Sequence, residues 1–213
     1  ARDKLVAQVA AGKSVAYVSE AGTPLVADPG YQLARGMIEG ALPVIAAPGA
    51  SAVLAALVVS GLPSDRFLFA GFPPQAKGAM TGWLKELAPV GATIILYESP
   101  RRVHRLLDVL SDTFGADRPV ALCRELTKRF EEVLRGTVDE VRTAIADRAL
   151  KGEIVVVIGK GAPVQVTAET MKDALRTARA TLSVKDAAAQ VAADLGLKKR
   201  DVYQAALKLE TDE

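Results

Sequence analysis

Two short segments rich in glycine and small residues are the part of this sequence best suited to holding a small molecule. SEAGTP (19–24) and APGASA (47–52) each follow an apolar stretch that is typical of a buried strand. Glycine lets the main chain approach a ligand closely, because it has no Cβ atom. The second segment also leads into a helical pattern, and the free N–H groups at a helix start can receive an anion. The residues predict a small-molecule cleft lined by backbone amides, although such segments also serve as plain turns.

Several familiar catalytic patterns are absent from the sequence. No GxGxxG follows a strand and no GxxxxGK[ST] occurs, which argues against a Rossmann-type oxidoreductase and against a nucleotide hydrolase. One histidine and one cysteine, His104 and Cys123, are too few for a His/Cys zinc site or an internal disulfide, and no metal is expected. A Ser-His-Asp triad would depend on His104, which lies in a helical pattern among arginines, so a solvated surface histidine is the simpler interpretation.

The composition is that of an ordinary globular protein with a sizeable core: 213 residues, 50% of them hydrophobic and 24% charged. Positive charge gathers in SPRRVHR (99–105), RELTKR (124–129) and LKKRD (197–201). Such patches often contact phosphates, although each alone also fits a solvated face. No apolar run approaches the roughly 18 residues of a membrane span, no secretory signal opens the chain, and the single cysteine fits a cytoplasmic setting.

Short β-branched runs alternate with helical patterns through most of the chain, which favours an α/β fold with largely parallel pairing in its first part. The predicted strands are 14–19, 42–49, 65–72, 92–99, 118–126, 130–138 and 153–159, and the predicted helices are 30–40, 50–61, 78–87, 100–114 and 137–152, the last ending at Gly152. The strands 118–126 and 130–138 are too close for a parallel crossover. We therefore expect an antiparallel hairpin and a mixed sheet in the second part.

The character of the chain changes after Gly161. A linker is predicted over 162–167, followed by helical segments without a strand signal. Ser183 is placed to cap one helix and Gly196 to end it, so the outline is helix, turn, helix. This outline fits a plain helical appendage or a nucleic-acid reader. The predicted domains are an N-terminal lobe (1–64), a C-terminal lobe (65–162) and a helical tail (163–213).

Five segments in this order resemble a known family: VSEAGTPLVADPG (18–30), PGASAVLAALVVSGLPSDRFLFAGFPP (48–74), YESPRR (97–102), CRELTKRFEEVLRGT (123–137) and KGEIVVVI (151–158). Together they are similar to the tetrapyrrole-methylase-like, class III S-adenosylmethionine-dependent methyltransferases. More narrowly, they resemble the branch that methylates the ribose 2′-hydroxyl of a cytidine in the decoding region of 16S rRNA. The resemblance runs from about residue 14 to 159, and the tail is similar to that branch's C-terminal helical extension.

The resemblance implies two α/β lobes, a mainly parallel N-terminal one and a mixed C-terminal one, with S-adenosylmethionine in the cleft between them, and a homodimer. The family's opening strand with its Pro-Ile-Gly-Asn loop, and an acidic Glu-Asp-Thr-Arg segment, would precede Ala1, so we expect the N-terminal part to be missing. The family usually has a histidine where this chain has Arg101. No role of that histidine can therefore be transferred.

The resemblance also implies site residues. Those matching the family's cofactor-binding positions are Ala21, Gly22, Thr23, Pro24, Val26, Ser51, Ala52, Tyr97, Glu98, Leu126 and Glu153. Core packing is an equally good interpretation of Val26, Ala52 and Leu126 taken singly. Glu98 and Glu125 are candidates for a catalytic base or a hydroxyl-orienting group, because both are carboxylates at the ends of predicted strands.

Six basic residues are candidates for binding rRNA: Arg102, Arg124, Lys128, Lys198, Lys199 and Arg200. A structural ion pair of Glu125 with Lys128 or Arg124 is an equally good alternative for those residues. Two rival functions stay open: a tetrapyrrole (corrin or porphyrin) C-methyltransferase of the same superfamily, and a non-catalytic rRNA-binding module. The basic segments and the tail favour RNA, since a small macrocycle needs no such tail.

Overall fold

The structure is a computed structural model that describes residues 2–161 and 168–211. Its contacts divide the chain into two compact units, residues 1–161 and 162–213. The predicted linker at 162–167 lies outside the described residues. The predicted boundary between residues 64 and 65 falls within the first unit and stays a prediction. Among the described residues, no helix has both the length and the apolar composition needed to cross a bilayer.

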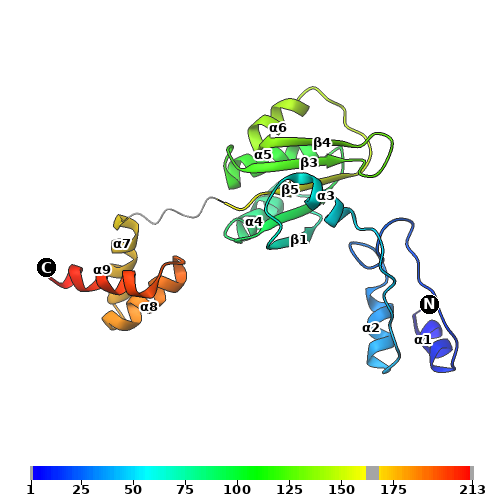
Figure 1. The fold of residues 1–213 in the computed structure, drawn as a ribbon, viewed down its shortest axis with the longest axis horizontal. Helices are drawn as coiled ribbons and strands as arrows, with labels where there is room; N and C mark the ends of the chain where they lie inside the picture. The colour runs from blue at the N-terminus through cyan, green and yellow to red at the C-terminus, as the bar shows by residue number, and fades with distance from the viewer. Residues whose placement is uncertain (1, 162–167, 212–213) are drawn as a thin grey trace. The chain divides into compact units, whose positions relative to one another are not determined.

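A five-stranded mixed sheet organises the first unit (Figure 1). Its strands are β1 (Phe67–Gly71), β2 (Thr93–Glu98), β3 (Pro119–Arg124), β4 (Glu132–Thr137) and β5 (Ile154–Ile158), in the spatial order β1-β2-β5-β3-β4. Strand β1 pairs with β2 in parallel, and every other pairing is antiparallel. Strands β3 and β4 form the hairpin that their short separation predicts. The α/β class and the mixed sheet are thereby confirmed.

Helices cover both faces of this sheet because successive side chains of a strand point to opposite sides. Ile94 and Leu96 of β2 are buried against α4 (Lys77–Leu87), α5 (Val103–Phe114) and α6 (Val138–Ile145). Ile95, between them, is buried on the other face against α3 (Ala52–Ser60). Figure 1 shows α3 lying across the sheet. Packing of the apolar helix α3 therefore fixes its first turn beside the strand ends.

The predicted strands 14–19 and 42–49 are wrong for this structure, and with them the parallel sheet expected in the first part. Between α1 (Arg2–Ala10), α2 (Tyr31–Glu39) and α3, both segments are irregular. Among the described residues, one backbone–backbone hydrogen bond reaches these segments, the local bond from the N–H of Leu42 to the carbonyl of Met37 at the end of α2, and neither segment pairs with a strand. Val18 and Ile45 are 82% and 90% exposed. Apolar, β-branched sequence favours a strand, but a strand forms only where a neighbour completes its hydrogen-bond ladder.

Helix α6 begins where the sequence predicts and ends earlier than predicted. Thr137 accepts a hydrogen bond from the N–H of Glu140, whose side chain accepts one from the N–H of Thr137, which is a complete capping box. The helix ends at Ile145 and not at Gly152. The Arg148 side chain instead reaches back to the Glu132 carboxylate of β4, 2.8 Å away. This contact draws the chain toward the sheet before β5.

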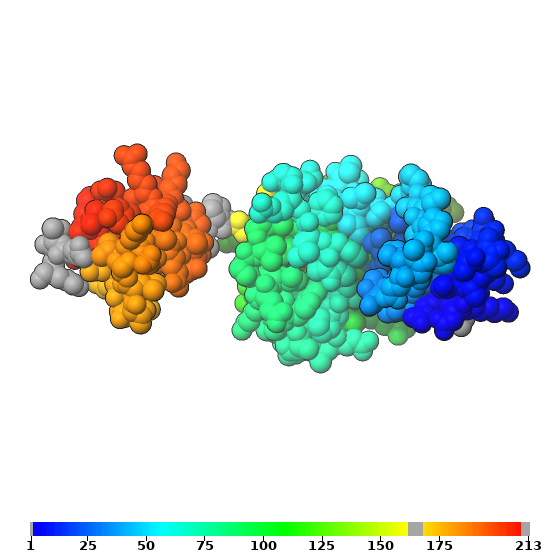
Figure 2. Space-filling model, turned by 90° about the horizontal axis from the view of Figure 1, so that it is seen from below, coloured from blue at the N-terminus to red at the C-terminus, as the bar shows by residue number. Residues whose placement is uncertain are grey.

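Three helices form the second unit: α7 (Ala168–Arg179), α8 (Val184–Asp194) and α9 (Lys199–Thr211). Figure 2 shows these helices as one cluster, in orange to red. The Ser183 hydroxyl accepts a hydrogen bond from the N–H of Asp186, and Gly196 follows α8 with a φ of +64°. Leu175, Val191 and Val202 are buried between the helices. The predicted cap, turn and helical character of the tail are confirmed.

Candidate active site

The two glycine-rich loops lie against each other in the first unit. The Thr23 hydroxyl donates a hydrogen bond of 3.0 Å to the carbonyl of Ala50. A Cβ atom added at Gly22 would lie 3.5 Å from the same carbonyl oxygen. The structure therefore brings Gly22-Thr23 next to Ser51 and Ala52, as a shared cleft requires. A structure with these loops on unrelated surfaces would have excluded the predicted cleft.

Unusual backbone geometry marks the first loop. Leu25 and Ala27 have φ angles of +72° and +58°, which non-glycine residues rarely adopt. The Ser19 hydroxyl donates to the carbonyls of Ala21 and Gly22, at 3.2 and 3.0 Å, and so fixes the entry to the turn. Strained backbone of this kind persists where surrounding structure holds it, and it clusters at binding sites. The geometry agrees with a loop shaped to present its main chain.

The Tyr97 hydroxyl reaches the first turn of α3. The backbone N–H of Val53 lies near it. Burial raises the pKa of Tyr97, the Val53 N–H acts to lower it, and the negative charges of Asp28 and Glu153 act to raise it. Ser51 is the N-cap residue of α3, but its hydroxyl makes no capping hydrogen bond. The Tyr97 hydroxyl at the end of β2 therefore lies near the start of α3, which Ser51 precedes.

Two aromatic residues that the sequence analysis did not single out hold the Tyr97 ring. The rings of Phe69 and Phe72 meet it edge-on, with centroids 4.8 and 5.5 Å away. Edge-to-face pairs of this kind restrict ring orientation and add about 0.5–1.5 kcal/mol beyond burial. The signal was present in FLFAGF (67–72), where aromatic residues recur at the end of a predicted strand.

Glu98 is 3% exposed and engaged at both oxygens. Its Oε1 accepts a hydrogen bond of 2.7 Å from the N–H of Ser99, and its Oε2 lies 3.1 Å from Arg102 Nη2 without hydrogen-bond alignment. The same Arg102 nitrogen donates to the carbonyls of Pro73 and Pro74, at 2.6 and 3.1 Å. Arg102 is thus tied to the protein and orients Glu98. Because of these contacts, the Arg102 guanidinium has few N–H groups left for a phosphate.

Glu125 forms a tight cluster with Lys128 and Glu153. Its Oε1 accepts hydrogen bonds from the N–H of Glu153 (2.8 Å) and from Lys128 Nζ (2.9 Å). Lys128 also lies 2.9 Å from the Glu153 carboxylate. The N–H of Glu153, followed by Lys128, lowers the pKa of Glu125. These contacts match the structural ion pair that was the alternative to a catalytic role for Glu125.

Glu153 and Leu126, the remaining predicted cofactor residues near the sheet edge, differ in how many of their main-chain N–H and carbonyl groups are free to bind a ligand. The backbone N–H and carbonyl of Glu153 both pair with Glu125. The main-chain groups of Leu126, by contrast, make no hydrogen bond to any described residue, while its side chain packs against the α3 core. Leu126 therefore has free main-chain groups beside the strand ends.

The predicted RNA-binding residues fall into two groups. Arg124 is mostly buried and lies 3.0 Å from the Glu132 carboxylate, which it shares with Arg148, so its guanidinium is already tied to the protein. Lys198, Lys199 and Arg200 are exposed at the start of α9 in the second unit. His104 Nε2 lies 3.2 Å from the Arg148 carbonyl, to which it can donate a hydrogen bond in the tautomer protonated at Nε2. Within the described ranges, no cluster of His, Cys, Asp and Glu could hold a metal ion.

Known families match both units of the chain. The family described as Tetrapyrrole (Corrin/Porphyrin) Methylases matches residues 1–142, and the RsmI C-terminal HTH domain matches residues 165–210. A protein named Ribosomal RNA small subunit methyltransferase I from Mycobacterium tuberculosis (strain CDC 1551 / Oshkosh) is 42% identical over 198 residues, which are 92% of this chain and 69% of that protein. A protein of the same name from Mesorhizobium japonicum is 43% identical over 211 residues, covering 97% of this chain and 70% of the relative.

Solved structures agree with this fold. The methyltransferase CobJ superimposes with a TM-score of 0.56 at 19% identity, over 78% of this chain and 72% of that one. Uroporphyrin-III-C-methyltransferase from Thermus thermophilus gives a TM-score of 0.53 at 22% identity, over 75% and 70% of the two chains. The chain therefore belongs to the tetrapyrrole methylase family of S-adenosylmethionine-dependent methyltransferases, in the group named ribosomal RNA small subunit methyltransferase I.

Proposed function

We propose that this chain methylates the ribose 2′-hydroxyl of a cytidine in the decoding region of 16S rRNA. The observation that carries the proposal is the contact of the two loops, Thr23 with Ala50, beside the Tyr97 hydroxyl. This arrangement supplies uncovered main chain and hydroxyl groups at one place in the fold. The names of the relatives support rRNA as the acceptor class. An rRNA acceptor would put the reaction in the cytoplasm.

The chain's residues fit S-adenosylmethionine. Gly22, Ala50 and Ala52 are small and exposed, and the Ser51 hydroxyl has no capping role. The predicted cofactor residues Ala21, Pro24 and Val26 continue the first loop, and Leu126 offers its free main-chain groups to the adenosine end. When bound, S-adenosylmethionine supplies an electrophilic sulfonium methyl group.

The chain's own contribution is positioning. In-line attack by a hydroxyl gains most from correct orientation, which is worth roughly 7–11 kcal/mol in favourable intramolecular reactions. We infer that Glu98, oriented by Arg102 and the N–H of Ser99, accepts a hydrogen bond from the acceptor hydroxyl. Glu125 remains the second candidate, but its lowered pKa and its Lys128 pair favour a structural role.

The Glu98 role is tested by methyl transfer with Glu98→Gln and Glu125→Gln variants, alongside cofactor affinity from calorimetry. We expect Glu98→Gln to lower the transfer rate at saturating cofactor by about 100-fold, the lower range for a lost acid–base or orienting group. The parallel affinity measurement separates this loss from any weaker cofactor binding, because Glu98 also matches a cofactor-binding position of the family. Glu125→Gln should lower it less. Equal, undiminished rates in both variants would remove both carboxylates from the reaction.

The tail is the second part of the proposal. Lys198, Lys199 and Arg200 surround the N-terminus of α9, where the helix dipole disfavours positive charge. Their placement therefore does not serve the helix, and we propose that they bind rRNA phosphates. Replacing all three by glutamine should reduce the salt dependence of rRNA binding by a slope of about 2. Glutamine at Lys77 and Lys85 of α4 is the matched control. An unchanged slope in the triple variant would end this proposal.

The acceptor itself is tested with labelled S-adenosylmethionine offered with small ribosomal subunits, free 16S rRNA or uroporphyrinogen. We expect label in the rRNA, at a 2′-O-methylcytidine in the nucleoside digest. Label in the macrocycle would support the C-methyltransferase alternative. Binding of rRNA without cofactor binding or methyl transfer would support the non-catalytic binding module, whereas detectable cofactor binding would argue against it. From the family resemblance we also propose two methylase lobes, 1–64 and 65–162, and a homodimer. Sedimentation of the protein tests the homodimer.

A further inference from the structure

One large aromatic side chain stands at the tip of the hairpin that joins β3 and β4. Phe130 is 63% exposed and packs against no other aromatic ring of the described residues, whereas Phe69 and Phe72 each pack edge-on against Tyr97. The guanidinium carbon of Arg129 lies 5.5 Å from the centroid of the Phe130 ring. An exposed phenylalanine on a loop gains nothing from the core. Its position therefore calls for an explanation other than packing.

The loop that carries Phe130 is held rigidly on both sides. On one side, Glu125 and Thr127 adopt φ angles of +51° and +65°, and Lys128 binds the carboxylates of Glu125 and Glu153. On the other side, the Glu131 carboxylate accepts a hydrogen bond of 2.6 Å from the N–H of Thr127, closing the turn across its own tip. A turn fixed by this many contacts presents its outer residues in a defined geometry.

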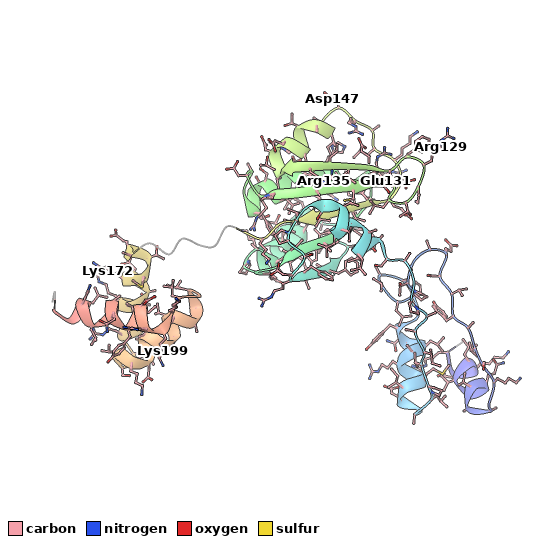
Figure 3. The ribbon with its side chains drawn as sticks, viewed as in Figure 1. Arg129, Glu131, Arg135, Asp147, Lys172 and Lys199 are labelled. Atoms are coloured by element: carbon pink, nitrogen blue, oxygen red, sulfur yellow. The ribbon has the colours of Figure 1, made fainter. Side chains whose placement is uncertain are left out.

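The charge at the tip belongs to Arg129. Lys128 is neutralised by two carboxylates, and Arg124 and Arg148 share Glu132. Arg129 makes no ion pair with any residue in the described part of the chain. Figure 3 shows its side chain projecting outward from the hairpin loop. An aromatic face next to an unpaired guanidinium is the combination with which proteins bind unpaired nucleotides, through base stacking and a phosphate contact.

The hairpin tip is also connected to the candidate active site. Leu126, four residues before Phe130, packs in the same core cluster as Tyr97. Glu153, which holds Lys128, is one of the charges that act on the Tyr97 hydroxyl. An RNA strand with one nucleotide in the candidate active site would therefore run past the β3–β4 hairpin loop.

We propose that Phe130 stacks on an unpaired base of the RNA substrate and that Arg129 contacts the adjoining phosphate. This inference rests on the proposed rRNA acceptor and names the residues that hold the strand beside the reacting nucleotide. Stacking selects single-stranded over duplex RNA, because a base inside a helix has no free face.

The proposal is tested by binding of the whole chain to a fluorescein-labelled single-stranded oligoribonucleotide of about ten nucleotides, compared with a duplex of equal length. We expect Phe130→Ala to weaken binding of the single strand by about 5- to 100-fold, the range for loss of one stacked base. Phe130→Trp should retain binding and show fluorescence quenching above the background of Trp83. Phe130→Leu keeps an apolar side chain without a ring and should not restore binding.

Salt dependence separates the two residues. Arg129→Gln should reduce the slope of log affinity against log salt by about 0.7, the value for one phosphate contact on a single strand, and Phe130→Ala should leave the slope unchanged. Phe67→Leu on β1, another exposed phenylalanine, is the matched control and should bind as the unaltered chain does.

The possible results are distinct. Equal single-strand affinity of the unaltered chain and Phe130→Ala overturns the stacking role and leaves the proposed function standing. The stacking role is also overturned if Phe130→Ala weakens binding of the single strand and of the duplex equally, or if Phe130→Leu binds the single strand as well as the unaltered chain does. If the unaltered chain binds neither RNA, this inference fails, and the methyl-transfer test with small ribosomal subunits and 16S rRNA decides the rRNA acceptor separately.

Discussion

The Thr23 hydroxyl and the Ala50 carbonyl are joined by a 3.0 Å hydrogen bond, although 27 positions separate them in the sequence. This bond fastens the first glycine-rich loop to the segment that opens α3. Each loop alone is a turn of small residues. Held together, the two loops form a surface of main chain that neither could provide by itself.

Removal of this hydrogen bond should loosen the cofactor site. Thr23→Val keeps the shape of the side chain and loses the donor, and a typical net hydrogen bond contributes about 0.5–1.5 kcal/mol. We expect the affinity for S-adenosylhomocysteine, measured by calorimetry, to fall by about 2- to 10-fold. Thr81→Val, which removes a hydroxyl bonded to the Lys77 carbonyl within α4, is the control and should bind normally. Identical affinities of the two variants would contradict the role given to Thr23.

The Glu125 side chain fills the space beside Gly152. A Cβ atom at Gly152 would lie 2.4 Å from the Glu125 carboxyl carbon, and Gly152 has a φ of +90°. Gly61 has a similar φ of +74° and nothing within 4 Å. Gly61→Ala should therefore cost about 1–2 kcal/mol of unfolding free energy from backbone strain alone, and Gly152→Ala should cost more.

Urea unfolding of Gly152→Ala, Glu125→Ala and the double variant measures the coupling. Removal of the Glu125 side chain should recover part of the loss at Gly152, because the clash disappears. Strictly additive losses would show that Glu125 does not occupy the space beside Gly152.

The Glu125 cluster should make stability depend on acid pH. The pKa of Glu125 is lowered from its ordinary 4.5, first by the N–H of Glu153 and then by Lys128. A carboxyl whose folded pKa is lowered contributes stability above its unfolded pKa, and that contribution is lost as the pH falls through the folded value. Between about pH 5 and pH 3 the urea midpoint of the unaltered chain should therefore fall more steeply than that of Glu125→Gln.

The pH test of the Glu125 cluster has a control variant, Glu86→Gln, and a second pH range on the alkaline side. Glu86→Gln removes an exposed carboxylate of α4 that has no ion pair among the described residues, and it should leave the acid limb unchanged. The pKa of Lys128 is raised from its ordinary 10.5 by Glu125 first and Glu153 second, so its contribution is lost only above that pH. Parallel acid limbs for the unaltered chain and Glu125→Gln would rule out this linkage.

Cys123 should be unreactive in the folded protein. It is fully buried in β3, and burial is the main cause that raises the pKa of its thiol from 9.0 to about 11. The thiolate fraction at pH 8 is then lower by about 100-fold, in addition to the loss of access. We expect no reaction with Ellman's reagent within the time in which the urea-unfolded chain reacts fully. Rapid labelling of the native chain would show that β3 opens readily.

The sequence by itself determined the elements whose signals are local. The short spacing of 118–126 and 130–138 predicted the β3–β4 hairpin, and Ser183 and Gly196 marked the ends of α8 in the tail. It also pointed to the loops at Gly22 and Ser51 through their glycine and small residues, although such segments also serve as plain turns. These features depend on neighbours a few residues apart, which composition and periodicity record directly.

Only the tertiary structure decided which distant groups meet. Segments 14–19 and 42–49 have strand-like sequences but no partner strand among the described residues, since pairing depends on backbone groups elsewhere in the fold. Glu125 and Glu98 looked alike as carboxylates at strand ends. Contacts across 28 residues with Glu153 gave Glu125 its structural cluster, whereas Arg102 and the Pro73-Pro74 carbonyls left Glu98 oriented at the site. The chemistry of a side chain is local, but the charges and hydrogen bonds that tune it come from whatever the fold brings beside it.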